Sequence, residues 1–291
     1  MADQPIVRIS TSKISSDAFG FSNVARIHRD LANFSGTKVT LDFGRLGWID
    51  GHLAASLHVI FLHAKARAIS FQFEGLSPSV AATLKKNLFL MPGQVDTYNT
   101  SIPLTEFDLN SAVSFSLFAK KHLQRKEMPS MSPALKGKFF EGIDELFANS
   151  ALHSKSPLPI TVCGQFFPKG RLLDFAMVDG GRGIAGSVSS TGRRFSDEAN
   201  AIDWAMQPGN TTREGDIPGG LGSEILREFI ALNGGRLIIA SGAGFWCQKG
   251  NNVIKSPLRH AFPGTTVILE INTSDRNKYD LAAPPDPTNI W

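Results

Sequence analysis

Cysteine is scarce in this sequence, and long apolar runs are missing. Cys163 and Cys247 are the two cysteines and lie far apart, so they indicate neither a disulfide framework nor a metal-ligand motif; we expect two buried, reduced thiols. The most apolar stretch, residues 53–62, contains His58 and is much shorter than the roughly 20 residues of a membrane span. The first residues, Met-Ala-Asp-Gln-Pro, lack the basic and apolar regions of a signal peptide. We therefore expect a soluble, cytoplasmic protein without a membrane partner.

A strong excess of one charge is also missing. Lys and Arg number 30 against 26 Asp and Glu, which gives a net charge of +4 and a sequence pI near 9.1. Because this excess is small and spread along the chain, we do not expect nucleic acid as a partner. The one basic run, residues 120–126, interrupts an apolar periodicity, which is typical of a solvated helix face; contact with nucleic acid or acidic lipid is the alternative.

The N-terminal part of the chain alternates between the hydrophobic periods of strands and helices. Short stretches rich in β-branched and aromatic residues predict strands at 6–9, 39–43 and 69–73. Apolar residues recur at helical spacing in 21–31 and 53–64. A third helix is expected from Ser77-Pro78 to residue 88, since serine caps helices and proline fits the first turn. This alternation predicts a layered α/β domain with crossover connections, to which we assign residues 1–108.

The rest of the chain is long enough for a second domain. We expect a linker helix within 109–132, a second domain over 133–273 and a proline-rich, extended tail over 274–291. In the second domain, a long helix follows Pro133, a helix capped by Ser196 or Asp197 runs to residue 204, and another covers 222–232. Strands are expected at 160–167, 172–178, 236–241, 245–249 and 265–271.

Polar residues spaced by four mark the long helix of the second domain. Glu145, Asn149 and His153 fall on one face of it, while Leu146 and Phe147 occupy the side that must be buried. An exposed helix face also carries polar residues at this spacing. The burial of the flanking apolar residues instead favours a stripe that faces a cavity.

Two glycine-rich segments follow. Asp179 ends a predicted strand and precedes Gly180, Gly181 and Gly183, a pattern that a plain tight turn also explains. Gly219, Gly220 and Gly222 precede a helix, whose free N–H groups and positive dipole end form a phosphate cradle. The loop 208–218 before it would be a lid, in which Arg213 either reaches a phosphate or is solvated.

Gly264-Thr265-Thr266 opens the last strand and completes four motifs in a fixed order. Together with the Glu145–Asn149 helix, the Asp179 turn and the glycine segment at 219–222, it resembles the ATP site of the gyrase, heat-shock chaperone, histidine-kinase and MutL superfamily (GHKL). The resemblance covers residues 133–273 and implies a two-layer α/β sandwich of the Bergerat type. It also implies ATP and Mg²⁺ as ligands.

The resemblance assigns the metal and phosphate roles first. Asn149 would coordinate Mg²⁺ on the phosphates, and Glu145 would be the general base that orients the attacking water or hydroxyl. His153 is either a donor near the phosphates or a helix C-terminal residue favoured by the dipole. Gly220, Leu221 and Gly222 would hold the phosphates.

It assigns the purine roles to the other two motifs. Asp179 would accept a hydrogen bond from the adenine amino group, Gly181 and Gly183 would let the backbone curl under the base, and Ile184 would be an apolar wall. Thr265 would help to hold the aspartate and a bridging water, although a threonine in a strand needs no such role.

The N-terminal part resembles a second family. Residues 39–53, followed by a helix and the stretch 69–78, are similar to the STAS fold of anti-sigma-factor antagonists. In regulatory members, the turn after the third strand carries a serine that a partner ATPase phosphorylates. Here Asp50-Gly51-His52-Leu53 stands at that turn, so the serine is missing; His52 is expected to be a polar surface residue, with phosphotransfer to it as the alternative. Ser56 is expected to pack within the helix.

Two functions follow from these resemblances. The first is an ATP-dependent protein (serine) kinase or ATPase related to anti-sigma-factor kinases, with a protein regulator or phosphoacceptor as partner. The second is a non-catalytic switch, in which ATP closes the loop 208–218 and changes a protein interface. Glu145 favours the first, because a protein that only binds ATP does not need a carboxylate there. Homodimers are frequent among such proteins, so the resemblance also allows one here.

Overall fold

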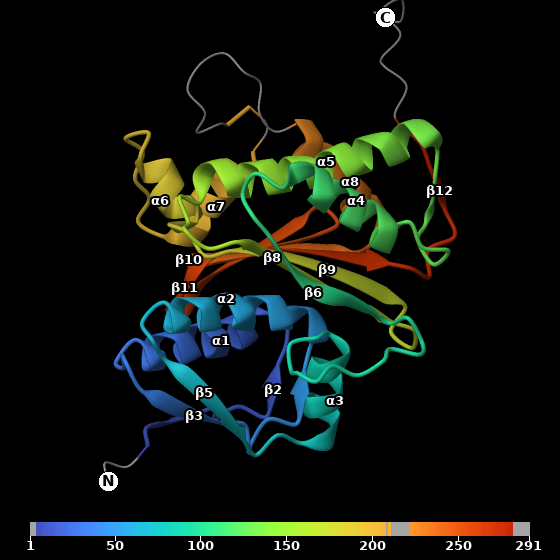
Figure 1. The fold of residues 1–291 in the computed structure, drawn as a ribbon. Coiled ribbons are helices and arrows are strands. Elements are labelled where there is room, and N and C mark those ends of the chain that lie inside the picture. Colours follow the sequence, from blue (N-terminus) through green and yellow to red (C-terminus); the bar gives the residue numbers. More distant parts are fainter. Residues whose placement is uncertain (1–3, 208, 211–220, 282–291) are drawn as a thin grey trace, which may run out of the picture.

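The computed structural model of the protein describes residues 4–207, 209–210 and 221–281. Helices and sheets alternate as layers: helices, a five-stranded sheet, two further helices and a small parallel sheet (Figure 1). The mixed α/β class expected from the sequence is confirmed.

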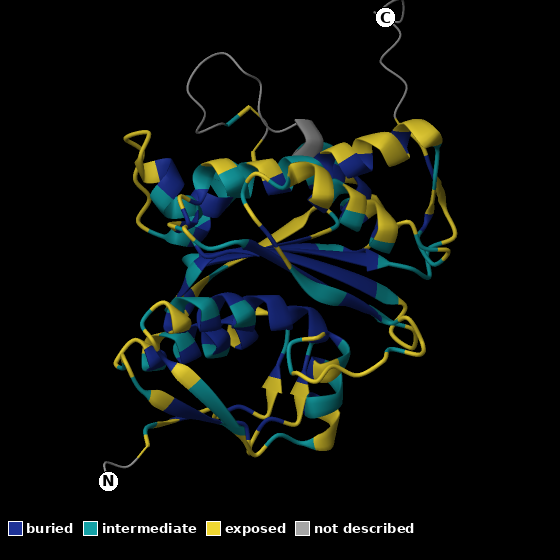
Figure 2. Cartoon of the chain, viewed as in Figure 1, coloured by how far each residue is buried: buried dark blue, intermediate teal, exposed yellow. Residues whose placement is uncertain are grey.

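The five-stranded sheet is antiparallel throughout and has the order β10-β11-β9-β8-β6. Its strands are β6 (Ser101–Phe107), β8 (Ile160–Phe167), β9 (Leu172–Asp179), β10 (Arg236–Lys249) and β11 (Asn252–Asn272). Seven of the eight residues of β9 are buried, so both faces of the sheet are covered (Figure 2). Strands buried on both faces carry nearly continuous apolar sequence, as β9 does between Asp174 and Asp179.

Helices of the C-terminal half cover one face of this sheet (Figure 1). They are α4 (Ala112–Leu123), α5 (Pro133–His153), α6 (Gly183–Ser189), α7 (Glu198–Ala205) and α8 (Leu221–Asn233). The signals read from the sequence are present: Ser132 caps α5, whose first residue is Pro133, and Asp197 caps α7. α5 packs on α8 through Phe139 and Phe229, whose ring centroids lie 5.3 Å apart.

The tail reaches back to α5. β12 (Lys278–Tyr279) pairs with β7 (Ser130–Met131) just before that helix, and the ring of Tyr279 packs against Phe229. This part of the region expected to be an extended tail is therefore docked on the C-terminal half. Residues 282–291 lie outside the described residues.

The N-terminal half forms the other two layers. Its parallel sheet has the order β1-β3-β5, and α1 and α2 lie between that sheet and the five-stranded one (Figure 1). Its elements are β1 (Ile6–Arg8), β2 (Lys13–Ile14), α1 (Ala18–Leu31), β3 (Lys38–Asp42), β4 (Trp48–Ile49), the 3-10 turn η1 (Gly51–Leu53), α2 (Ala54–Lys65), β5 (Ser70–Glu74) and α3 (Pro78–Lys86). The expected alternation of strands and helices is present, with β2 pairing with β4 in addition.

Among the described residues, two hydrophobic core clusters lie on the two faces of the five-stranded sheet, and one of them contains residues of both halves. Phe21 of α1 is fully buried and lies edge-on to Phe262 of β11, at 6.3 Å between ring centroids, and beside Phe245 of β10. In addition β6, which lies within residues 1–108, is hydrogen-bonded to β8 of the C-terminal half. The interface between the halves is therefore an interior, not a surface contact between separate cores.

Among the helices that the structure describes, none combines the length and apolarity needed to cross a membrane.

Phe21→Ala tests the shared core. Deleting this ring should lower the free energy of unfolding by about 3–5 kcal/mol, since it leaves a cavity that both halves line. Phe19→Ala, on the same helix but 58% exposed, is the matched control and should cost less than about 0.5 kcal/mol. Urea unfolding followed by tryptophan fluorescence and by far-UV circular dichroism should give one coincident transition in each protein. Two separated transitions in the wild type would contradict a core cluster shared by the two halves.

Candidate functional site

Asp179 lies at the end of β9, and only 4% of it is exposed. The backbone N–H of Gly181 donates to its carboxylate at 3.0 Å, and the side chain of Ser150 on α5 makes a second hydrogen bond. Burial raises the pKa of Asp179 to about 7, and these hydrogen bonds offset only part of that effect. Above that pH Asp179 is a buried carboxylate that can accept a hydrogen bond from a ligand, and below it the carboxyl keeps its proton.

The turn after Asp179 depends on glycine. A side chain at Gly181 would place its Cβ 2.1 Å from the carbonyl oxygen of Ser154, and Gly183 has a φ of +74°. The glycines predicted to let the backbone curl therefore meet two separate requirements: close approach to α5 and a left-handed backbone. The contact draws the turn against the C-terminal end of that helix.

A hydroxyl pair holds the next segment. The N–H of Ile184, in the first turn of α6, donates to Ser241 Oγ at 2.8 Å, and that oxygen lies 3.0 Å from Thr265 Oγ1. Thr265 is also the cross-strand partner of Asp179. The structure thus brings Asp179, Gly183, Ile184 and Thr265 together. Ser241 was missed, because its partners are 57 and 24 residues away and no local pattern marks it.

The C-terminal end of α5 is fixed to the same turn. The carbonyl of His153 accepts hydrogen bonds from Arg182 Nε and Ser187 Oγ, at 3.0 and 3.1 Å. The carbonyl of Ser154 accepts from the N–H of Arg182 at 2.8 Å. His153 is the last residue of α5 and so lies at the negative end of the helix dipole, the place that one of its two predicted roles requires.

The polar stripe of α5 leads away from this anchored end. Glu145, Asn149 and His153 are each half-buried, and Asn149 directly precedes Ser150, which contacts Asp179. Spacing by four places the three on one face of the helix. The described residues gather no group of three or more His, Cys, Asp or Glu side chains that could hold a metal ion. A cation near Asn149 would therefore need oxygens from a bound ligand and water, as Mg²⁺ commonly has.

Part of the predicted phosphate segment lies outside the described residues. Arg213, Gly219 and Gly220 belong to that part. α8 begins at Leu221 and contains Gly222, so a helix starts directly after the glycine pair, as expected. Its first N–H groups have no partner within the helix itself.

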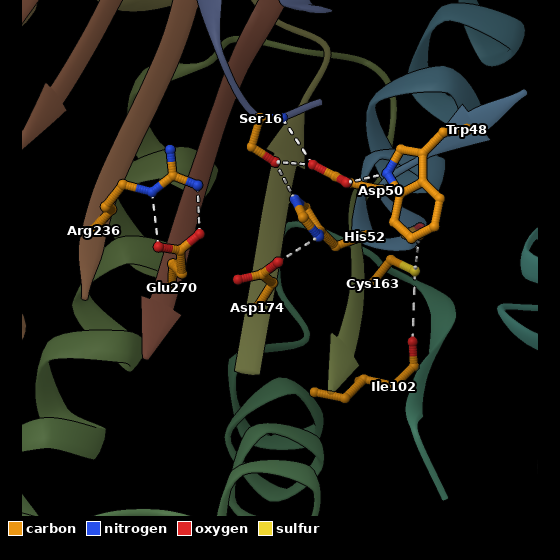
Figure 3. Close-up of polar contacts among 10 residues, drawn as sticks. Ser16, Trp48, Asp50, His52, Ile102, Cys163, Asp174, Arg236 and Glu270 are labelled. Atoms are coloured by element: carbon orange, nitrogen blue, oxygen red, sulfur yellow. Dashed lines mark hydrogen bonds and ion pairs between the residues drawn. The ribbon is translucent and has the colours of Figure 1, made fainter. Parts of the chain in front are cut away.

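His52 corrects an expectation. It was expected to be a polar surface residue, yet it is 1% exposed and lies in η1 against the five-stranded sheet, where its Nδ1 is 3.0 Å from Asp174 Oδ2 (Figure 3). As folded, its side chain is not accessible to a phosphate donor.

Ser56 packs within the interior as expected, and its hydroxyl lies 3.1 Å from Thr266 Oγ1 on β11. Cys163 and Cys247 are free, buried thiols, as predicted.

A separate cavity of about 460 Å³ opens beside α8 and β10. Its lining residues are Gln207, Glu224, Arg227, Glu228, Ala231, Leu232, Gln248 and Asn251. None of them belongs to the predicted site, and carboxylates on both sides of Arg227 leave little net charge there for an anion.

No protein-family model matches this sequence, and no curated protein is significantly similar to it.

Asp179→Asn tests the buried carboxyl without any ligand. Folded Asp179 retains its proton up to a pKa of about 7, whereas the unfolded residue releases it near 3.8, so the folded state binds more protons between these values. This group therefore lowers stability as pH rises from 4 to 7. Relative to wild type, Asp179→Asn should gain roughly 3 kcal/mol in unfolding free energy between pH 4.5 and 8.

Urea unfolding at a series of pH values measures this difference. Asp42→Asn is the control, because the carboxyl of Asp42 is 36% exposed at the surface. The Asp42→Asn variant retains Asp179, so its unfolding free energy should still fall as pH rises from 4.5 to 8 because of that buried carboxyl. If the same fall persisted in Asp179→Asn, Asp179 would not be a carboxyl destabilised by burial.

Proposed function

We propose that the chain is an Mg-ATP-binding regulatory protein of the GHKL type, an ATPase or protein (serine) kinase related to anti-sigma-factor kinases. The five-stranded sheet with α4, α5 and α8 on one face would be the two-layer Bergerat-type unit. The N-terminal parallel sheet with its helices would be the STAS-like unit. An antiparallel sheet with helices on one face and a strand–helix alternation in the other half support this division.

The observation that carries the proposal is the environment of Asp179. Adenine presents an amino donor beside a ring acceptor, and the carboxylate of Asp179 supplies an acceptor fixed by Gly181 and Ser150. The close backbone at Gly183 and the half-buried Ile184 would offer an apolar wall to the purine plane. The hydroxyls of Ser241 and Thr265 would fix the position of Ile184 relative to Asp179.

The phosphates would lie between α5 and the start of α8. Asn149 offers a side-chain oxygen to Mg²⁺ bound by the phosphates, and Glu145, one turn earlier, could take a proton from an attacking water or hydroxyl. The N-terminus of α8 would favour anions through its first N–H groups and the helix dipole. Arg213, Gly220, Leu221 and Gly222 would complete this end, and His153 would be either a donor there or a cap of the helix dipole.

One contact favours the second candidate, an ATP-gated switch without turnover. A Cβ on Gly180 would lie 2.9 Å from His63 Nε2 and 3.1 Å from Val59, so α2 of the N-terminal half packs directly behind the Asp179 turn. A purine that orders this turn would therefore change its packing against α2 of the N-terminal half, and no hydrolysis would be needed. In either case a protein partner is expected on a regulatory protein of this kind, and a homodimer is compatible with it.

Asp179→Asn should weaken ATP binding at least tenfold at pH 8, because the amide can present a donor to the adenine amino group and leaves a buried group unpaired. Asp144→Asn is the matched control: this carboxyl lies on α5 and bonds to Ser116 Oγ at 2.9 Å, away from Asp179. It should bind ATP as the wild type does. Titration calorimetry with Mg²⁺ and ATP measures both; unchanged affinity in a folded Asp179→Asn variant would refute the purine site.

Glu145→Ala separates an enzyme from a switch. It should keep ATP affinity within about threefold while turnover falls by about 10²–10⁴, the usual contribution of a general base. Glu141→Ala, one turn earlier on α5 and paired with exposed Lys138, should retain turnover. ADP release measured in a coupled assay, with and without host extract, gives the comparison. ATP binding by the wild type without turnover in every condition would favour the switch.

A further inference from the structure

A row of polar side chains crosses the face of the five-stranded sheet that the N-terminal half covers. Gln165 on β8, Asp174 on β9, Glu270 on β11 and Arg236 on β10 are successive partners in the strand register. Asp174 and Glu270 are only 4% and 7% exposed. Like charges directly opposite each other on neighbouring strands repel, and burial strengthens the repulsion. Each carboxylate therefore needs a cation of its own.

The two cations come from different halves of the chain. Arg236 pairs with Glu270, with Nε 2.7 Å from Oε1 and Nη2 2.5 Å from Oε2 (Figure 3). Asp174 is left for His52 of the N-terminal half, at 3.0 Å. This approach is an ion-pair contact, and both His52 Nδ1 and the other oxygen of Asp174, Oδ1, are buried without a hydrogen-bond partner. An ionised Asp174 thus depends on a charged His52.

A hydrogen-bonded chain leads from His52 towards the surface. His52 Nε2 lies 2.5 Å from Ser16 Oγ, and the N–H and hydroxyl of Ser16 both reach Asp50 Oδ2, at 3.0 and 3.3 Å (Figure 3). The indole N–H of Trp48, which is 49% exposed, donates to Asp50 Oδ1 at 2.8 Å. Ser16 and Asp50 therefore offer a path by which the buried imidazole exchanges a proton with solvent.

The order Ser16–His52–Asp174 is also that of a nucleophilic triad. Ser16 is only 3% exposed and its hydroxyl is shared with Asp50, so a substrate cannot approach its oxygen in the folded state. These three hydrogen-bonded and paired side chains therefore have a structural role and do not act on a substrate.

The contact between η1 and β8, beside His52, is close but leaves buried polar side chains without hydrogen bonds. A Cβ on Gly51 would lie 1.9 Å from Gln165 Oε1 and 2.4 Å from Asn87 Nδ2, so a larger residue there would require the ends of both side chains to move. Polar side-chain atoms of Asn87 and Gln165 at this contact are buried and make no hydrogen bond within the protein. Burying such groups costs free energy when they are not hydrogen-bonded. Their burial therefore opposes the contact between η1 and β8.

We propose that Ser16, His52 and Asp174 form a proton-controlled latch between the N-terminal half and the five-stranded sheet. The latch is closed while His52 is positively charged and opens when His52 loses its proton, because Asp174 then becomes a buried charge without a partner beside Glu270. Opening separates η1 and the start of α2 from β8 and β9. The latch is a property of the fold and does not require nucleotide.

The charges around His52 give the direction of this pH dependence. Burial alone would lower the pKa of His52, but Asp174, Asp50 and Glu270 together raise it above its ordinary 6.5, with Arg236 engaged by Glu270. Cys163, which faces η1 from β8, remains a thiol because burial raises its pKa to about 12. Burial raises the pKa of Asp174 as well, and the neighbouring His52 opposes that rise. The folded pair therefore holds its shared proton to higher pH than the two groups do in the unfolded chain. The stabilisation is complete below pH 6.5 and is lost as pH rises through the folded value.

Cys163 is a built-in probe of the opening. It is fully buried, and its Sγ lies 3.7 Å from the carbonyl oxygen of Gly51 in η1. In a Cys247→Ser background it is the single cysteine, and its protection factor is the rate of alkylation by N-ethylmaleimide in urea divided by the rate in the folded protein at the same pH. That ratio cancels the change in thiolate content of the unfolded reference.

The protection factor should fall at least tenfold between pH 6 and pH 9 in this parent, while far-UV circular dichroism stays unchanged. His52→Gln should make it constant within twofold, whereas His58→Gln, a half-buried histidine paired with Glu106, should retain the fall. If His52→Gln does not fold, Asp174→Asn serves instead: it removes the buried charge and should abolish the fall. A parent profile that is flat, or a fall that persists in His52→Gln or Asp174→Asn, would overturn the latch. The assay contains no nucleotide, so its outcome is independent of ATP binding.

Discussion

Burial of an antiparallel sheet on both faces is the constraint on which the rest of this structure depends. Such sheets commonly pack one face on a core and leave the other to water. Here the helices α1 and α2 of the N-terminal half cover the second face, so every polar residue on the central strand β9 needs a partner within the protein (Figure 2). Asp174 and Asp179 are the two residues of β9 on which this requirement falls.

Strand geometry separates these two carboxyls. Residues an odd number apart on a strand point to opposite faces, so Asp174 faces the N-terminal half and Asp179 faces the layer of α5. Asp174 finds His52, and Asp179 finds Gly181 and Ser150. One strand thus carries the proposed latch on one face and the proposed purine acceptor on the other. Packing of Val59 and His63 behind Gly180 gives the two faces a second, direct connection.

Local signals were enough to predict most elements. Serine caps followed by proline placed the starts of α3 and α5, and short apolar runs placed β3, β8 and β9. Local signals do not predict long-range strand pairing. Nothing in the local sequence shows that β6 joins the C-terminal sheet or that β11 is one strand of 21 residues. The same reason hid Ser241 and the row from Gln165 to Arg236, since both exist only once distant strands are in register. His52 was misjudged because a lone histidine at a helix start gives no sign of the surface that will cover it.

A crystal structure with Mg²⁺ and a non-hydrolysable ATP analogue tests the central claim most directly, because it locates both ends of the ligand at once. The adenine amino group should lie about 3 Å from the carboxylate of Asp179. Mg²⁺ on the phosphates should be coordinated by the side-chain oxygen of Asn149 at about 2.1 Å. A nucleotide bound elsewhere, or one that contacts neither residue, would contradict the account.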